Sequence, residues 1–192
     1  VGSIGIDDII TPKAKARGVL GGSASYASYA ISLFSRPQVI AVVGTDFQDN
    51  YLPDFSDRGI DTRGVEIVPG ETFRWCGEYL ENFNERITHW THLNVFADFD
   101  PKVPAAYKEA EFVFLANIDP DLQLKVLREM KAPRFTLVDT MELWINIKKN
   151  SLLELFSQVS AVIINESEAQ MLFGTRDLFA AAKEVVKLGP EW

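Results

Sequence analysis

Short apolar stretches that favour strands alternate with helical stretches along most of the chain. Val39–Val43 is a compact run of mainly β-branched residues, and a helical segment follows over Asn50–Arg58, with Gly59 at its C-terminal end. The alternation is interrupted and then returns from Glu111 onward. Because strand, helix and strand in this order build parallel sheets with right-handed crossovers, we predict an α/β fold.

The other segments of this alternating pattern have the same character. We expect further strands at Val1–Ile6, Phe112–Ala116, Phe135–Val138 and Ala161–Ile164, and helical regions at Pro120–Met130, Ile145–Val159, Glu166–Phe173 and Leu178–Leu188.

The segment 60–99 has a different texture. Gly64–Val68, Thr72–Leu80 and Ile87–Phe96 are rich in β-branched and aromatic residues, and turn residues separate them at 69–70 and 82–85. We predict a small antiparallel sheet inserted into an α/β domain that comprises residues 1–59 and 100–192. Such a small sheet needs another surface to bury one face, so it could serve as a lid or a subunit interface.

A glycine pair, Gly21 and Gly22, leads into a helix of small and apolar residues that begins near Ser23. We expect Ser23 to be the N-cap. Glycines before a helix N-terminus let a ligand approach bare N–H groups at the positive end of the helix dipole. The alternative is a tight turn followed by a closely packed helix.

Polar residues follow the predicted strands at five points. They are Asp7, Asp46, Asn117 with Asp119, Asp139, and Asn165 with Glu168. Asp and Asn also cap helices and close turns, which accounts for any one of them. As a set along the carboxyl edge of a sheet they favour a polar ligand site, and their carboxylates suit Mg²⁺ together with substrate phosphates.

Composition excludes several other classes. A net charge of −8 argues against a partner nucleic acid or an anionic membrane surface, and we find no apolar run long enough for a membrane span. The single cysteine excludes an internal disulfide and favours a cytoplasmic protein, and His89 and His92 lie in the aromatic segment rather than in a zinc pattern. Signatures of P-loop, dinucleotide-binding and serine-hydrolase proteins are missing.

Six stretches together resemble one family. VGSIGIDD, GGSASYASYA, VVGTDF, GETFRW, VDTMELW and NESEAQML resemble, in order and spacing, the ribokinase-like (PfkB) carbohydrate and nucleoside kinases. This resemblance implies a doubly wound, mainly parallel sheet flanked by helices, with a small antiparallel β lid. It also implies ATP-dependent phosphorylation of a hydroxymethyl group of a sugar or nucleoside, with Mg²⁺ as the metal.

The resemblance assigns roles by position. Substrate-binding residues would be Asp7, Gly21, Gly22, Ser23, Tyr26, Arg74, Asn117 and Asp119, while Asp139 and Asn165 would lie on the ATP side and Glu168 near the metal. Tyr26 stands where ribokinases have Asn, so ribose itself is not the expected acceptor.

One family signature, Asp-Thr-x-Gly-Ala-Gly-Asp, does not occur in these 192 residues. In the family it carries the catalytic base and a backbone anion hole. We therefore expect the sequence to be incomplete and inactive alone. The alternative function is a non-catalytic sugar- or nucleoside-binding or regulatory protein, and a general Rossmann-like domain with a structural insertion is a third.

Aromatic residues of the predicted lid also suggest an assembly. Large apolar surfaces usually mark interfaces, so we expect a homodimer that forms through the lid. The aromatic residues concerned are Phe73, Trp75, Tyr79, Trp90 and Phe96.

Overall fold

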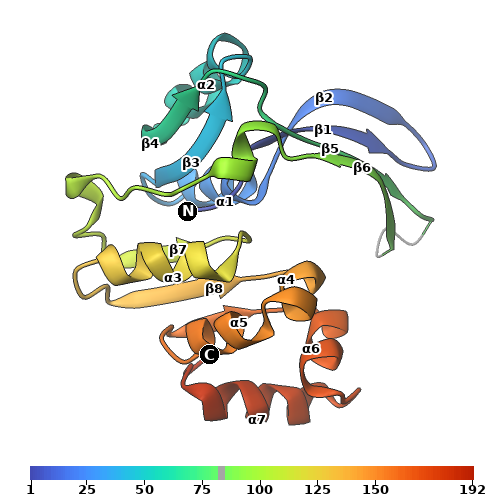
Figure 1. Ribbon diagram of the computed structural model, residues 1–192, viewed down its shortest axis with the longest axis vertical. Helices are drawn as coiled ribbons and strands as arrows, with labels where there is room; N and C mark the ends of the chain where they lie inside the picture. The colour runs from blue at the N-terminus through green and yellow to red at the C-terminus, as the bar shows by residue number, and fades with distance from the viewer. Residues whose placement is uncertain (82–84) are drawn as a thin grey trace. The chain divides into compact units, whose positions relative to one another are not determined.

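The structure is a computed structural model that describes residues 1–81 and 85–192 (Figure 1). The chain divides into two units: an N-terminal unit, Gly2–Pro101, and a C-terminal unit, Lys102–Trp192 together with Val1. In the described part of the chain, no helix is long and apolar enough to cross a membrane.

The N-terminal unit contains two sheets. Its elements are β1 (Gly5–Ile10), β2 (Lys15–Gly21), α1 (Ser23–Ser32), β3 (Gln38–Gly44), α2 (Gln48–Asp57), β4 (Asp61–Val68), β5 (Phe73–Tyr79), β6 (Arg86–His92) and a 3₁₀ helix (Asn94–Asp98). One sheet has the order β2-β1-β5-β6, in which β1 and β5 are parallel and the outer pairs antiparallel. The other is the parallel pair β3-β4.

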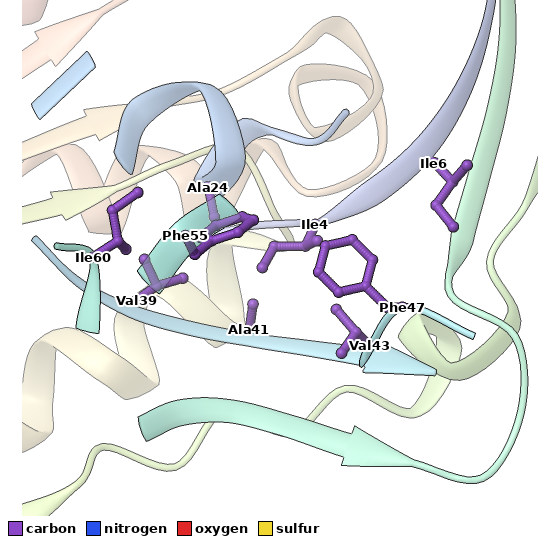
Figure 2. Close-up of a cluster of buried hydrophobic side chains, with 9 residues drawn as sticks. All are labelled: Ile4, Ile6, Ala24, Val39, Ala41, Val43, Phe47, Phe55 and Ile60. Atoms are coloured by element: carbon purple, nitrogen blue, oxygen red, sulfur yellow. The ribbon is translucent and has the colours of Figure 1, made fainter. Parts of the chain in front are cut away.

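A cluster of buried apolar side chains holds this unit together. Figure 2 shows residues of β1, α1, β3 and the α2 region gathered in this core. Burial of such side chains is the main stabilising contribution to folding. The members are Ile4, Ile6, Ala24, Val39, Ala41, Val43, Phe47, Phe55 and Ile60.

The C-terminal unit is an α/β arrangement with a parallel sheet in the order β7-β8-β9. Its elements are a 3₁₀ helix (Ala105–Tyr107), β7 (Phe112–Leu115), α3 (Pro120–Glu129), β8 (Phe135–Asp139), α4 (Glu142–Ile147), α5 (Lys149–Phe156), β9 (Ala161–Ile163), α6 (Glu166–Phe173) and α7 (Leu178–Leu188). The predicted bounds of the last two helices are confirmed. The helical region predicted at Ile145–Val159 is two helices that meet at Lys148, whose φ of −133° is not helical.

The N-terminal strand differs from the prediction. It runs over Gly5–Ile10 and forms a hairpin with β2, so Asp7 lies inside a strand instead of just past its end. Asp8 closes this hairpin, because its Oδ1 accepts a hydrogen bond from the Gly18 N–H at 2.9 Å. The basic residues Lys15 and Arg17 lie in the exposed first part of β2.

The predicted three-stranded meander is also corrected. Gly64–Val68 belongs to β4, which pairs in parallel with β3 rather than with the aromatic strands. Only β5 and β6 pair as predicted, and the segment after His92 turns into a 3₁₀ helix. The predicted turn at 82–85 lies mostly outside the described residues.

Candidate functional site

The first group of predicted site residues lies on the sheet β2-β1-β5-β6, where Asp7 lies over Gly21. Only 7% of Asp7 is exposed, and its Oδ1 has no hydrogen-bond partner among the residues that the structure describes. A Cβ on Gly21 would collide with this carboxylate, so only glycine leaves room for it. Burial, and then the neighbouring charge of Asp8, raise the pKa of Asp7 to about 6.

Gly22 lies where the chain enters α1. Its φ of 93° and ψ of 146° are accessible essentially to glycine alone, and a Cβ there would lie 2.5 Å from the Ser3 carbonyl oxygen. Gly22, not Ser23, is the N-cap, so the predicted cap is wrong by one residue.

Ser3 forms hydrogen bonds with the first residues of α1. The Ser23 N–H donates to Ser3 Oγ at 3.1 Å, and the Ala24 N–H donates to the Ser3 carbonyl at 2.8 Å. Ser23 Oγ in turn accepts from the Ser3 N–H at 3.2 Å. The N–H groups of Ser23 and Ala24 are therefore engaged, contrary to the expectation that they are bare.

Tyr26 projects from the first turns of α1 with more than half of its surface exposed. Partial burial, followed by the charges of Asp7 and Tyr79, raises the pKa of its hydroxyl. The ionisation of Tyr26 is thus influenced by Asp7 and by Tyr79, the last residue of β5.

Arg74 joins a separate network at the end of β3. Its Nη2 donates to Asp46 Oδ2 at 3.1 Å, and Asp46 Oδ1 accepts from the Thr72 N–H at 2.9 Å and its hydroxyl at 2.6 Å. Burial opposes ionisation of Asp46, but the hydrogen bonds from Thr72 and Arg74 prevail and lower its pKa. Arg74 pairs with Ile6, the residue before Asp7 on β1. Because successive residues of a strand project to opposite faces, Arg74 and Asp7 lie on opposite faces of the sheet.

The second group of predicted residues lies in the C-terminal unit, where Asn117 and Asp139 meet. Burial raises the pKa of Asp139, whereas the backbone N–H groups of Thr140 and Asn117 donate to its carboxylate and oppose the shift. The side chain of Asn117 accepts a hydrogen bond from Trp144 Nε1 at 2.9 Å. The structure thus brings together the residues that follow β7 and end β8.

Asp119 caps a helix. Its Oδ1 accepts from the Asp121 N–H at 2.9 Å at the start of α3, and Lys148 Nζ lies 3.4 Å from its Oδ2. Lys148 also pairs closely with Asp121. This is the capping role that the sequence left open as an alternative.

Asn165 and Glu168 form a reciprocal capping box at the start of α6. The Glu168 N–H donates to Asn165 Oδ1, and the Asn165 N–H donates to Glu168 Oε2, both at 2.9 Å. Glu168 is buried, with 7% of its surface exposed. Among residues 1–81 and 85–192, no three His, Cys, Asp or Glu side chains are clustered to hold a metal ion.

Sequence reasoning missed Gln123, a fully buried residue of α3. Its Nε2 donates to the carbonyl oxygens of Leu115, Ala116 and Asp139 at 2.9, 3.1 and 3.0 Å. One amide thereby ties the end of β7 to the end of β8. A glutamine in an amphipathic helix reads as a surface residue, so the sequence carries no signal for this contact.

We expect Gln123→Met, which keeps the volume but removes the donors, to destabilise the protein by about 3 kcal/mol, because buried carbonyls lose their partner. Thermal unfolding followed by circular dichroism should show a midpoint about 6–12 °C lower. Gln158→Met is the control, since Gln158 makes only a long, exposed contact with Glu154. Equal midpoints for the two variants would contradict a clamping role.

Comparisons with known proteins agree with this fold. The model of the pfkB family carbohydrate kinases matches residues 8–192. The cytidine kinase of Thermococcus kodakarensis is 30% identical over 188 residues, which cover 95% of this chain and 66% of that protein.

Solved structures of low sequence identity share the fold. The nucleoside kinase of Methanocaldococcus jannaschii, described as an archaeal member of the ribokinase family, superposes with a TM-score of 0.72 at 17% identity, covering 95% of this chain and 65% of that one. The Burkholderia thailandensis nucleoside kinase in complex with ADP-inosine gives a TM-score of 0.81 at 16% identity, covering 98% and 65%. The chain spans slightly less than two thirds of the length of these relatives.

The predicted fold is thereby confirmed: parallel strands flanked by helices, with a mixed sheet in the N-terminal unit. Because the family model extends over nearly all of the sequence, the chain belongs to the pfkB family of carbohydrate kinases.

Proposed function

We propose that the protein is an ATP-dependent kinase that phosphorylates the hydroxymethyl group of a nucleoside. Its family consists of kinases, and its curated relative at 30% identity is a cytidine kinase. The observation that carries the proposal is the buried Asp7 carboxylate, which lies over Gly21 with one oxygen left without a partner among the described residues. A free sugar is the second candidate acceptor.

On the acceptor side, the ionised Asp7 would accept hydrogen bonds from ribose hydroxyl groups. Charge-assisted hydrogen bonds of this kind are stronger than neutral ones, and the low dielectric of a mostly buried site strengthens them further. Gly21 keeps space for the carboxylate, and Tyr26 near the start of α1 is exposed and electrostatically coupled to Asp7. Strands β5 and β6, which belong to the predicted lid at residues 60–99, would then cover the acceptor.

On the nucleotide side, we propose roles for Asp139, Asn165 and Glu168. Their oxygen atoms are the hard donors that Mg²⁺ prefers, and a Mg²⁺ ion that keeps most of its waters needs only one or two protein carboxylates. When bound, Mg²⁺ would neutralise charge on the phosphates of ATP. No residue of 1–192 is assigned as the general base.

Two finer expectations stay proposals. We propose a cytoplasmic protein that forms a homodimer through the predicted lid, residues 60–99, where Ile87 on the edge strand β6 is half-exposed.

The test is a kinase assay on the whole protein as its gene encodes it. Purified protein is mixed with ATP, Mg²⁺ and a panel of nucleosides and free sugars, and ADP release is measured by a coupled assay. We expect turnover with at least one nucleoside and a 5′-phosphorylated product by phosphorus NMR. Nucleoside binding by calorimetry without any ADP release would instead support the non-catalytic alternative.

A further inference from the structure

Three glycines on one face of the sheet β2-β1-β5-β6 each lie under a neighbouring side chain. Asp7 covers Gly21, as described above. A Cβ on Gly5 would lie 2.6 Å from the ring of Phe73, and a Cβ on Gly77 would overlap the six-membered ring of Trp75. The indole of Trp75 therefore lies down on the sheet across Gly77 instead of standing up from it.

The orientation of this indole is fixed from two sides. Trp75 Nε1 donates to Thr88 Oγ1 on β6 at 3.2 Å. Tyr79 meets Trp75 edge to face, with ring centroids 6.4 Å apart and an interplanar angle of 75°. Trp75 remains partly exposed, so these contacts leave part of the ring accessible.

The register of the sheet sets this indole beside the buried carboxylate. Trp75 on β5 pairs with Asp7 on β1, and paired residues of adjacent strands project from the same face. A hydrogen-bond acceptor for hydroxyl groups and a flat aromatic surface are therefore neighbours on one rigid element. The ring of Tyr79, which meets the indole edge to face, adds to this aromatic surface.

We propose that Trp75, held flat on Gly77, is the platform on which the planar base of a nucleoside acceptor stacks while Asp7 holds the ribose. This inference rests on the proposed function and narrows its acceptor to the nucleosides. A nucleoside joins a ribose, which carries hydroxyl groups, to a flat base. The face of the sheet that carries Asp7 and Trp75 presents a carboxylate next to an indole. Stacking on an aromatic side chain is sequence-tolerant, because every base has a π-face.

The test compares variants of the whole protein with cytidine and with free ribose as ligands. For Trp75→Ala we expect a KM for cytidine raised about 10-fold or more, with the KM for ATP unchanged, because a stacking partner is lost. Binding of ribose should change less than twofold. Gly77→Ala should act in the same direction, since a methyl group there displaces the indole.

Trp90→Ala is the matched control. Trp90 on β6 pairs with Cys76, so it lies on the opposite face, where its ring contacts His92. We expect Trp90→Ala to leave the ratio of the KM values for cytidine and for ribose at the wild-type level. Trp75→Leu keeps an apolar side chain without a π-face and serves if the alanine variant does not fold.

Distinct outcomes separate this inference from the proposed function. Equal losses for cytidine and ribose would overturn the base platform while leaving a kinase. If the wild type releases no ADP, the kinase proposal fails, and the same comparison is made with calorimetric Kd values. A cytidine Kd that Trp75→Ala and Trp75→Leu leave unchanged, or no cytidine binding by the wild type, would then overturn the inference.

Discussion

Asp7→Asn is expected to raise the acceptor KM by about 10- to 100-fold, because a hydrogen bond to a charged group contributes about 1.5–3 kcal/mol. The substitution keeps the shape of the side chain and removes only its charge. The KM for ATP should stay within about twofold. Steady-state kinetics on the whole protein, with each substrate varied in turn, measures both values.

The same residue predicts a pH dependence of acceptor binding. Because the pKa of Asp7 is raised to about 6, the carboxylate is protonated below that pH and loses its accepting charge. The wild-type acceptor KM should therefore rise as the pH falls through 6, whereas the KM of Asp7→Asn should not show this inflection. Asp8→Asn is the control, since loss of the neighbouring charge should move the wild-type inflection to lower pH.

The pH dependence of folding stability should be opposite to that of acceptor binding, because the buried Asp7 destabilises the fold when it is ionised. A carboxyl whose pKa rises from 3.8 to about 6 on folding adds no penalty below pH 3.8, an increasing one between these values and a constant one above pH 6. At pH 8, Asp7→Asn should thus be more stable than the wild type by about 1–2 kcal/mol, discounted for solvent screening. The difference should shrink towards pH 4. An unchanged KM and an unchanged pH profile would together rule out Asp7 as the acceptor's anchor.

Gly22→Ala is expected to lower the thermal midpoint by about 6–12 °C, corresponding to a destabilisation of about 3 kcal/mol. The new methyl group would meet the Ser3 carbonyl oxygen at 2.5 Å and the Ile4 Cα at 2.8 Å, and backbone atoms of a core strand cannot move aside cheaply. The positive φ adds strain. Thermal and urea unfolding of the whole protein measure the loss.

Substitutions at two other glycines separate the cost of steric overlap from the cost of a positive φ. Gly59 also has a positive φ, but no described atom outside its immediate neighbours lies within 4 Å of an added Cβ. Gly59→Ala therefore reports the conformational penalty alone, about 1 kcal/mol. At Gly21 the obstacle is a side chain, the carboxyl group of Asp7, and not the backbone, so Gly21→Ala should keep the fold and lose acceptor affinity. If Gly22→Ala unfolds no earlier than Gly59→Ala, the steric argument is wrong.

Local patterns made the C-terminal unit the easier part to predict. A capping box depends on residues three apart, so Asn165 and Glu168 could be read directly, and the helices at Glu166–Phe173 and Leu178–Leu188 follow from their apolar spacing. In contrast, the β1-β2 hairpin is partly exposed and carries Asp, Lys and Arg, which weakens every strand signal. Its partner β5 lies more than fifty residues further along the chain.

The candidate site was predictable only in part, because some of its contacts join residues that are distant in the sequence. Asp7 and the glycine pair belong to stretches whose resemblance to the family is visible in the sequence, and the structure places Asp7 against Gly21. Gln123 and Trp75 depend on atoms from strands that are distant in sequence, so only the fold reveals that one clamps two strand ends and the other lies on a glycine.

The glycine-backed face is also sensitive to single substitutions. Three glycines on this face leave recesses, because they lack the Cβ atom that other residues carry. A neighbouring side chain lies in each recess: Phe73 at Gly5, Asp7 at Gly21 and Trp75 at Gly77. The smallest coding change, from glycine to alanine, would lift one of these side chains out of its recess. Single substitutions at these three positions would therefore each reshape this face, so its fine structure is set by three residues that have no side chain.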